Sequence, residues 1–102
     1  MSMFYEFTAK LWKRSEADKA SRYFITVDPQ ISDTLKQYAI TIPRKWRWSL
    51  RVEAMIGYLK WKTSIFPDKK SGCYVLPIKS QIRRALQLDE GSTCHLSLSI
   101  LS

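Results

Sequence analysis

Apolar and polar residues alternate along much of the chain, as they do in strands that bury one face. The clearest case is the first, where Met3, Tyr5, Phe7, Ala9 and Leu11 share one face. A short apolar run, CYVLPI at 73–78, is typical of a more deeply buried strand that ends near Pro77. We predict six strands, over 3–12, 23–27, 50–56, 59–65, 73–78 and 94–100.

Two stretches change to the helical period. Asp28-Pro29 supplies an N-cap and a proline at the first helical position, and predicts a helix over 29–38. Its buried positions are expected to be Ile31, Leu35 and Tyr38. A second helix is predicted over 80–87, with Ile82, Ala85 and Leu86 facing inward and Arg83 and Arg84 facing water. The polar segment 13–21 and the segment 66–72 (FPDKKSG) are predicted to be loops.

A two-residue turn at Gly57-Tyr58 is expected to join two of the strands, because glycine suits the position of a II′ turn that needs a positive φ. This turn sets the register of the hairpin. Ala54 would lie opposite Trp61 and Glu53 opposite Lys62, and both are favourable cross-strand pairs. The other predicted pairs are Ile56 with Leu59, Val52 with Thr63, Leu50 with Ile65 and Met55 with Lys60.

The order strand, strand, helix, strand occurs twice. Segment 23–35 (YFITVDPQISDTL) aligns without gaps on segment 74–86 (YVLPIKSQIRRAL), with four identities in 13 positions. Any two units of this order would align on apolar pattern alone, but the identities favour a duplication, with pseudo-repeats at about 3–56 and 58–101. Each half is too short to close a core by itself. We therefore predict a single domain over 1–102, mainly β with two short helices, whose duplicated unit closes a six-stranded β-barrel.

Composition agrees with one folded domain, since 45% of the 102 residues are hydrophobic and 25% are charged. Charges at Glu6, Lys10, Lys13 and Arg14 are unlike the apolar region of a signal peptide. No stretch approaches the ~20 apolar residues of a membrane span. These features predict a cytoplasmic protein without membrane contact.

Residues that carry catalysis are scarce. Cys73 and Cys94 are expected to be buried free thiols rather than a disulfide. His95 is the only histidine, and the chain has neither metal-ligand spacing nor a nucleophile motif. The sequence therefore predicts a protein that is not an enzyme and needs no metal or cofactor.

Basic charge is concentrated in the middle of the chain. The net charge is +8, and residues 44–84 hold eleven basic side chains against two acidic ones. Such a segment suits an anionic partner, although lysines on loops and outer strand faces usually only keep a domain soluble. Candidate contacts for the partner are Arg44, Lys45, Arg47, Lys60, Lys62, Lys69 and Lys70. Trp46 and Trp48 are candidates for stacking on a base, or for covering one end of the barrel.

Part of the second half resembles the half-barrel motif of the AbrB and MazE transcription factors. The motif is carried here by Leu76-Pro77-Ile78, Ile82, Arg83, Leu86, Leu88 and Gly91. A longer resemblance, to the domain of unknown function 1905 family, covers nearly the whole chain. It rests mainly on the run WKTSIFPDKKSGCYVLPI at 61–78, with departures in the 13–22 segment and at 46–48. The resemblance implies a double-split β-barrel and no activity, because none is established for the family.

Two functions remain open at this point. Small size, basic charge and the lack of catalytic groups favour a non-catalytic module that binds an acidic protein or serves as an accessory. The alternative is nucleic-acid binding through the basic 44–84 segment. Because both halves of the barrel would lie in one chain, we expect a monomer or a weak homodimer.

Overall fold

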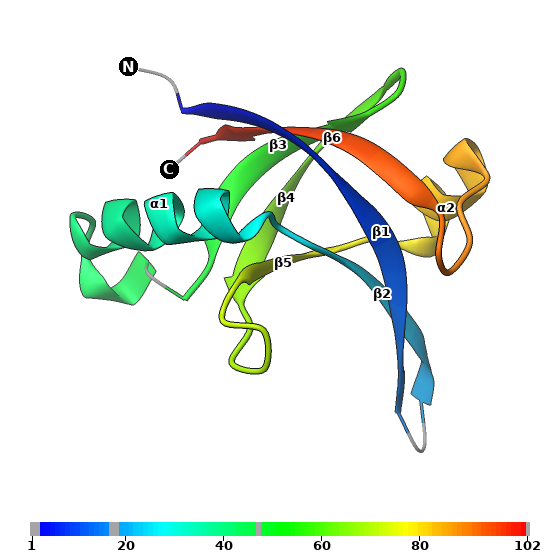
Figure 1. The fold of residues 1–102 in the computed structure, drawn as a ribbon, viewed down its shortest axis with the longest axis horizontal. Helices are drawn as coiled ribbons and strands as arrows, with labels where there is room; N and C mark the ends of the chain where they lie inside the picture. The colour runs from blue at the N-terminus through cyan, green and yellow to red at the C-terminus, as the bar shows by residue number, and fades with distance from the viewer. Residues whose placement is uncertain (1–2, 17–18, 47, 102) are drawn as a thin grey trace.

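Six antiparallel strands close into a barrel, which confirms the predicted fold class. The computed structural model describes residues 3–16, 19–46 and 48–101, apart from the side chains of residues 16, 19, 20 and 46. The strands are β1 (Phe4–Glu16), β2 (Lys19–Thr26), β3 (Leu50–Ile56), β4 (Leu59–Pro67), β5 (Tyr74–Pro77) and β6 (Thr93–Ile100). Their order around the barrel is β1-β2-β5-β4-β3-β6. Helices α1 (Pro29–Ile40) and α2 (Ser80–Leu86) lie at opposite sides of the barrel (Figure 1).

Helix α1 begins where its N-cap predicts. The carboxylate of Asp28 accepts hydrogen bonds from the backbone N–H groups of Gln30 (3.0 Å) and Ile31 (3.3 Å). These bonds satisfy two donors that have no partner within the first turn. The helix runs two residues further than predicted, to Ile40, and a short 3₁₀ turn, η1 (Arg44–Trp46), follows it.

The predicted register of the β3–β4 hairpin is confirmed at all six predicted pairs, among them Ala54 opposite Trp61 and Glu53 opposite Lys62. Gly57 at the turn has φ +59°, as the first central position of a II′ turn requires. The ion pair differs from the one that the register suggests. The carboxylate of Glu53 lies 3.8 Å from the ammonium of Lys60, its diagonal neighbour, although Lys62 is the residue directly opposite it.

The prediction of a loop over 13–21 is wrong. There β1 and β2 continue as a hairpin that extends beyond the barrel (Figure 1), with Lys13 paired to Tyr23 and Arg14 to Arg22. The rings of Trp12 and Phe24 stack at 5.0 Å on its outer face. The polar segment carries no apolar alternation because it has no core to face, so its strands are stabilised by local pairing.

Helix α2 also differs from its predicted orientation. Ile82 and Leu86 pack against the core as expected, but Ala85 is exposed. Arg83 is half-buried and lies over the ring of Tyr23, instead of facing water. A helix of seven residues has fewer than two full turns beyond its caps, so the apolar period defines its buried face poorly.

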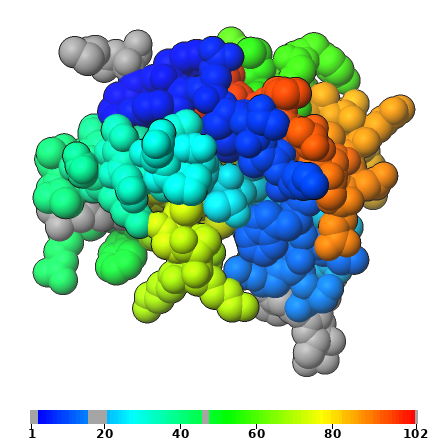
Figure 2. All heavy atoms as spheres, in the orientation of Figure 1, coloured from blue at the N-terminus to red at the C-terminus, as the bar shows by residue number. Residues whose placement is uncertain are grey.

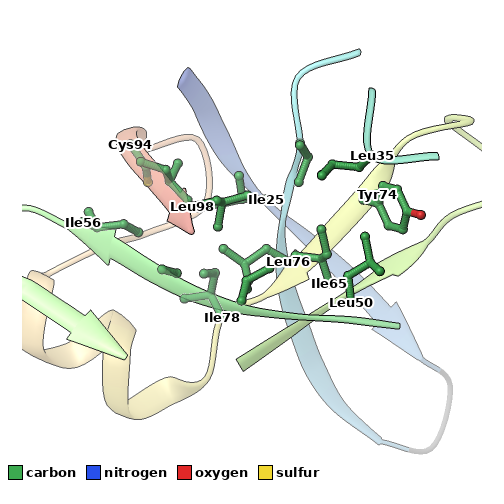
Figure 3. Packing of buried hydrophobic residues seen from close by; sticks show 14 of the residues in the cluster. Ile25, Leu35, Leu50, Ile56, Ile65, Tyr74, Leu76, Ile78, Cys94 and Leu98 are labelled. Carbon is green, nitrogen blue, oxygen red and sulfur yellow. The ribbon is translucent and has the colours of Figure 1, made fainter. Parts of the chain in front are cut away.

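The barrel interior is filled by aliphatic side chains from all six strands, with Leu35 and Ala39 added by α1. Ile25, Leu76 and Ile65 lie in the middle of this cluster (Figure 3), and each is fully buried. Cys73 and Cys94 are buried free thiols, as predicted. Burial raises the pKa of the Cys94 thiol.

The strand pairs are unchanged when the two halves of the chain are exchanged. Replacing β1, β2 and β3 by β4, β5 and β6 converts the six neighbouring pairs into the same six. Ile25 pairs with Leu76, and the 51-residue offset between them turns the flanking pair Phe24 and Pro77 into the observed pair Thr26 and Val75. In the alignment of the two halves, Phe7 corresponds to Trp61 and Leu96 to Val52. Phe7 pairs with Leu96, but Trp61 pairs with Ala54, so the two registers differ by two residues. A shift of two residues keeps each side chain on its face of the sheet. The duplication stays a prediction, but the barrel has the internal twofold relation that it requires.

Ser32 provides a test of how α1 is attached to the barrel. Its fully buried hydroxyl donates to the carbonyl of Val27 and accepts from the N–H of Tyr74, both at 3.1 Å. We expect Ser32→Ala to lower the free energy of unfolding by about 1–3 kcal/mol, because both backbone groups lose their partner. Urea denaturation measures the loss. Thr34→Ala removes an exposed hydroxyl from the same helix and should change stability by no more than about 0.5 kcal/mol. Equal effects would contradict the bridging role.

Candidate anion-binding groove

A groove opens where β5 ends. Beyond Pro77 no strand lies between β2 and β4 in the described part of the chain, and the two separate around a space of about 730 Å³. The start of α2 and the segment before it close one side. The groove is lined by Ser21, Arg22, Tyr23, Lys62, Thr63, Ser64, Phe66, Pro77, Ile78, Lys79, Ser80 and Arg83.

The lining carries four cations: Arg22 from β2, Lys62 from β4, Lys79 before α2, and Arg83 within α2. None of the described residues that line it is acidic. Four like charges around one concave surface raise the local positive potential, and the low-dielectric walls focus it. The groove therefore has the electrostatic character of an anion site.

Arg83 is held in the groove by an aromatic ring. Its guanidinium carbon lies 3.8 Å from the ring centroid of Tyr23, which is a close cation–π contact. Its Nε is buried and has no hydrogen-bond partner among the described residues. The cation–π contact fixes the guanidinium at the groove wall, so that its terminal N–H groups are already positioned for an anion.

The outer face of β4 adds a row of polar and aromatic side chains to the groove. Lys62, Ser64 and Phe66 alternate along it, about 7 Å apart at the period of a strand. The ring of Phe66 is 43% exposed. The described pairing of β4 with β5 covers only Phe66 and Pro67. At Lys62, therefore, the edge of β4 that is turned away from β3 faces the groove without a neighbouring strand.

The internal twofold relation provides a comparison site within the same molecule. The 51-residue offset places Tyr74 at the position of Tyr23, and Ser32 at the position of Arg83. There Tyr74 is only 2% exposed, and its backbone N–H donates to the buried Ser32 hydroxyl. Trp12 pairs with Phe24 as Phe66 pairs with Val75, so β1 corresponds to β4 at an offset of 54 residues. The counterparts of the four cations are therefore Cys73 for Arg22, Thr8 for Lys62, Asp28 for Lys79 and Ser32 for Arg83. The positive charge is thus a property of one of two equivalent sites rather than of the barrel scaffold.

Of the basic residues singled out from the sequence, only Lys62 lines the groove. Lys60 pairs with Glu53 instead, and Arg44 and Lys45 are exposed on η1. Lys69 and Lys70 lie in the loop between β4 and β5. Trp48 is 69% exposed and does not line the groove. Arg47 and the side chain of Trp46 are outside the described residues.

Sequence reasoning missed Arg22, Lys79 and Arg83 as site residues. A signal for two of them was present in the repeat alignment, where Lys79 replaces Asp28 and Arg83 replaces Ser32. A basic residue that replaces an acidic or neutral one in only one of two repeats cannot be required by the shared scaffold. Comparing the repeats by charge would have pointed to this side of the barrel.

Other features give no competing centre in the part of the chain that the structure describes. No group of three or more His, Cys, Asp and Glu side chains is placed to hold a metal ion. None of the described helices is both long and apolar enough to cross a membrane. Thr8 and His95 form a 2.9 Å hydrogen bond on the exposed outer face of the β1–β6 pair.

Comparisons with known proteins identify a family but no activity. No curated protein matches the chain. The sequence profile of a family described as a domain of unknown function (DUF1905) matches residues 7–98. This match covers nearly all of the barrel, from within β1 to within β6. The chain belongs to the DUF1905 family.

Proposed function

We propose that this protein is a non-catalytic module that binds single-stranded nucleic acid in the groove between β2, β4 and α2. The observation that carries the proposal is the set of four cations in the groove, none of which recurs at the equivalent site of the other half. A volume of about 730 Å³ is typical of small-ligand pockets. It suits one or two nucleotides of a flexible strand.

The residues divide the work by their chemistry. Arg22 and Arg83 present planar guanidinium groups that match phosphate oxygens in pairs, whereas Lys62 and Lys79 act as compact point charges. The exposed ring of Phe66 can stack on an unpaired base, a contact worth ~1–3 kcal/mol. Because phosphate contacts carry no sequence information, binding should depend little on base identity. We expect the protein to act as a monomer or a weak homodimer.

An acidic protein segment is the second candidate. The edge of β4 beside Lys62 has no neighbouring strand among the described residues, so an extended peptide could add to it by backbone hydrogen bonds. The four cations would then pair with its carboxylates. The nucleic acid is favoured because two arginines and an exposed ring suit phosphates and bases more closely than they suit carboxylates.

The salt dependence of binding tests the assignment of Lys62. We expect Lys62→Gln to make the slope of log affinity against log salt concentration shallower by about 0.7, the value for one phosphate contact on a single strand. Fluorescence anisotropy with a labelled oligothymidine across a salt series measures the slope. Lys60→Gln is the matched control, since it removes the same charge from the same face of β4, two residues away.

An unchanged slope in Lys62→Gln, or an equal change in Lys60→Gln, would contradict the assignment. Binding to a polyglutamate peptide, without binding to the oligothymidine, would replace the nucleic acid by an acidic protein partner. Absence of binding to either probe at low salt would overturn the groove as an anion site.

A further inference from the structure

The basic surface does not stop at the groove. Arg22, which lines the groove, also lies on the outer face of the β1–β2 hairpin, directly opposite Arg14. The guanidinium carbons of both arginines lie 5.2 Å from the ring centroid of Phe24, and that of Arg14 lies 5.4 Å from Trp12. These contacts lead without a break from the groove to Arg14.

The pairing of Arg14 with Arg22 is unfavourable in isolation. Like charges directly opposite each other on one face of a sheet destabilise the pair. The rings beneath them offset part of this repulsion through cation–π contacts. An anion bound over Arg14 and Arg22 would offset the remaining repulsion, so this face of the hairpin is more stable with a polyanion bound.

A third group of cations follows beyond Arg14. The guanidinium of Arg14 lies 3.8 Å from the carboxylate of Asp68. Asp68 is the first residue of the β4–β5 loop, which also carries the exposed Lys69 and Lys70. In Figure 2 this loop (yellow-green) and the hairpin (blue) project from the same lower side of the molecule. Arg14, Asp68, Lys69 and Lys70 together carry a net charge of +2.

Asp68 forms its hydrogen bonds within the β4–β5 loop. Its carboxylate accepts hydrogen bonds from the hydroxyl (2.8 Å) and the N–H (3.2 Å) of Ser71. The hydrogen bond from the Ser71 hydroxyl is the main cause that lowers the pKa of Asp68, so the carboxylate is ionised at neutral pH. The 3.8 Å contact to Arg14 is loose, and the guanidinium keeps donors free for a phosphate.

We propose that a bound single strand leaves the groove past Arg22, crosses the hairpin over Arg14 and ends on the loop that carries Lys69 and Lys70. This inference rests on the proposed function, and it extends the site from one or two nucleotides to a longer stretch. The rings of Trp12 and Phe24 lie beneath the arginines, so contact along this part is with phosphates and is independent of sequence.

The length dependence of the salt slope tests this path. Affinity itself rises with oligonucleotide length through the number of binding registers, whereas the slope reports the phosphates that are neutralised. Three further cations (Arg14, Lys69 and Lys70) should make the slope for a dodecamer steeper by about 2 than the slope for a tetramer. The probes are labelled oligothymidines of both lengths, with anisotropy as the readout.

Two variants should reduce this difference and one should keep it. Arg14→Gln should reduce it by about 0.7, and the double variant Lys69→Gln/Lys70→Gln by about 1.4. The double variant leaves the hairpin packing intact, which guards against a folding defect in Arg14→Gln. Lys10→Gln removes an exposed charge from the same outer face of β1, four residues before Arg14 and outside the groove, and should leave the slope for both lengths unchanged.

Each outcome separates the two proposals. Equal slopes for tetramer and dodecamer, with both still sensitive to Lys62→Gln, would overturn the path and leave the groove site standing. A dodecamer slope that Lys10→Gln reduces as much as Arg14→Gln would also overturn the path. If neither oligonucleotide binds, the proposed function itself falls.

Discussion

Replacing Arg22, Lys62 and Arg83 together by glutamine should weaken binding of a single-stranded oligonucleotide at low salt by at least about 100-fold. Each hydrogen bond to a charged group contributes about 1.5–3 kcal/mol, so three such contacts account for about 4 kcal/mol or more. The loss should shrink as salt is raised, because the contacts act through displaced counterions. Anisotropy titrations at two salt concentrations measure both effects.

A second triple variant controls for net charge. Lys36, Arg44 and Lys45 are exposed on α1 and η1, and α1 lies on the opposite side of the barrel from α2 (Figure 1). None of the three lines the groove, and replacing them by glutamine removes the same three charges. We expect this variant to bind within about threefold of the unmodified protein, because distant surface charges are screened over about 10 Å at moderate salt. If both triple variants lose affinity alike, the protein binds through its overall charge rather than through the groove.

Leu76→Ala should be among the most destabilising single substitutions in this chain. Leu76 is fully buried and pairs with Ile25 at the centre of the internal twofold relation, where both halves of the barrel meet. Truncating a buried leucine costs about 2–5 kcal/mol, through lost burial and the cavity left behind. A domain of this size has a total stability of about 5–15 kcal/mol, so the variant should unfold at a much lower urea concentration.

Leu101→Ala makes the same chemical change at a position that is 47% exposed, and it should shift the free energy of unfolding by no more than about 0.5 kcal/mol. Both variants are compared by urea denaturation followed by Trp fluorescence. A small loss in Leu76→Ala, similar to that in Leu101→Ala, would mean that β5 does not form the interior seam of the barrel.

Sequence reasoning succeeded where a local signal and the core act together. The alternation of 50–56 and 59–65 and the glycine at the turn agreed on one register, and the structure has it. Reasoning failed where no core is present to impose a pattern. The hairpin beyond Trp12 reads as polar and aperiodic, yet it pairs as strands because cross-strand rings and backbone hydrogen bonds suffice there.

The candidate site was harder to predict, because it is assembled from three elements that are distant in the chain. Basic density along the sequence pointed to Arg44 and Lys45, which the fold leaves outside the groove. Arg22 lies in a segment with little net charge, so density could not identify it. Only the barrel closure, which brings β2 beside the end of β5, places Arg22 near Lys79 and Arg83.

The most direct test of the central claim is a map of amide chemical shifts on adding an oligothymidine tetramer. The internal twofold relation supplies the controls within one spectrum. We predict that the amide signals of Tyr23, Lys62 and Arg83 move, while those of their counterparts Tyr74, Thr8 and Ser32 stay in place. Movement centred on the η1 segment, or shared equally by both sets, would contradict the claim that this groove is the binding site.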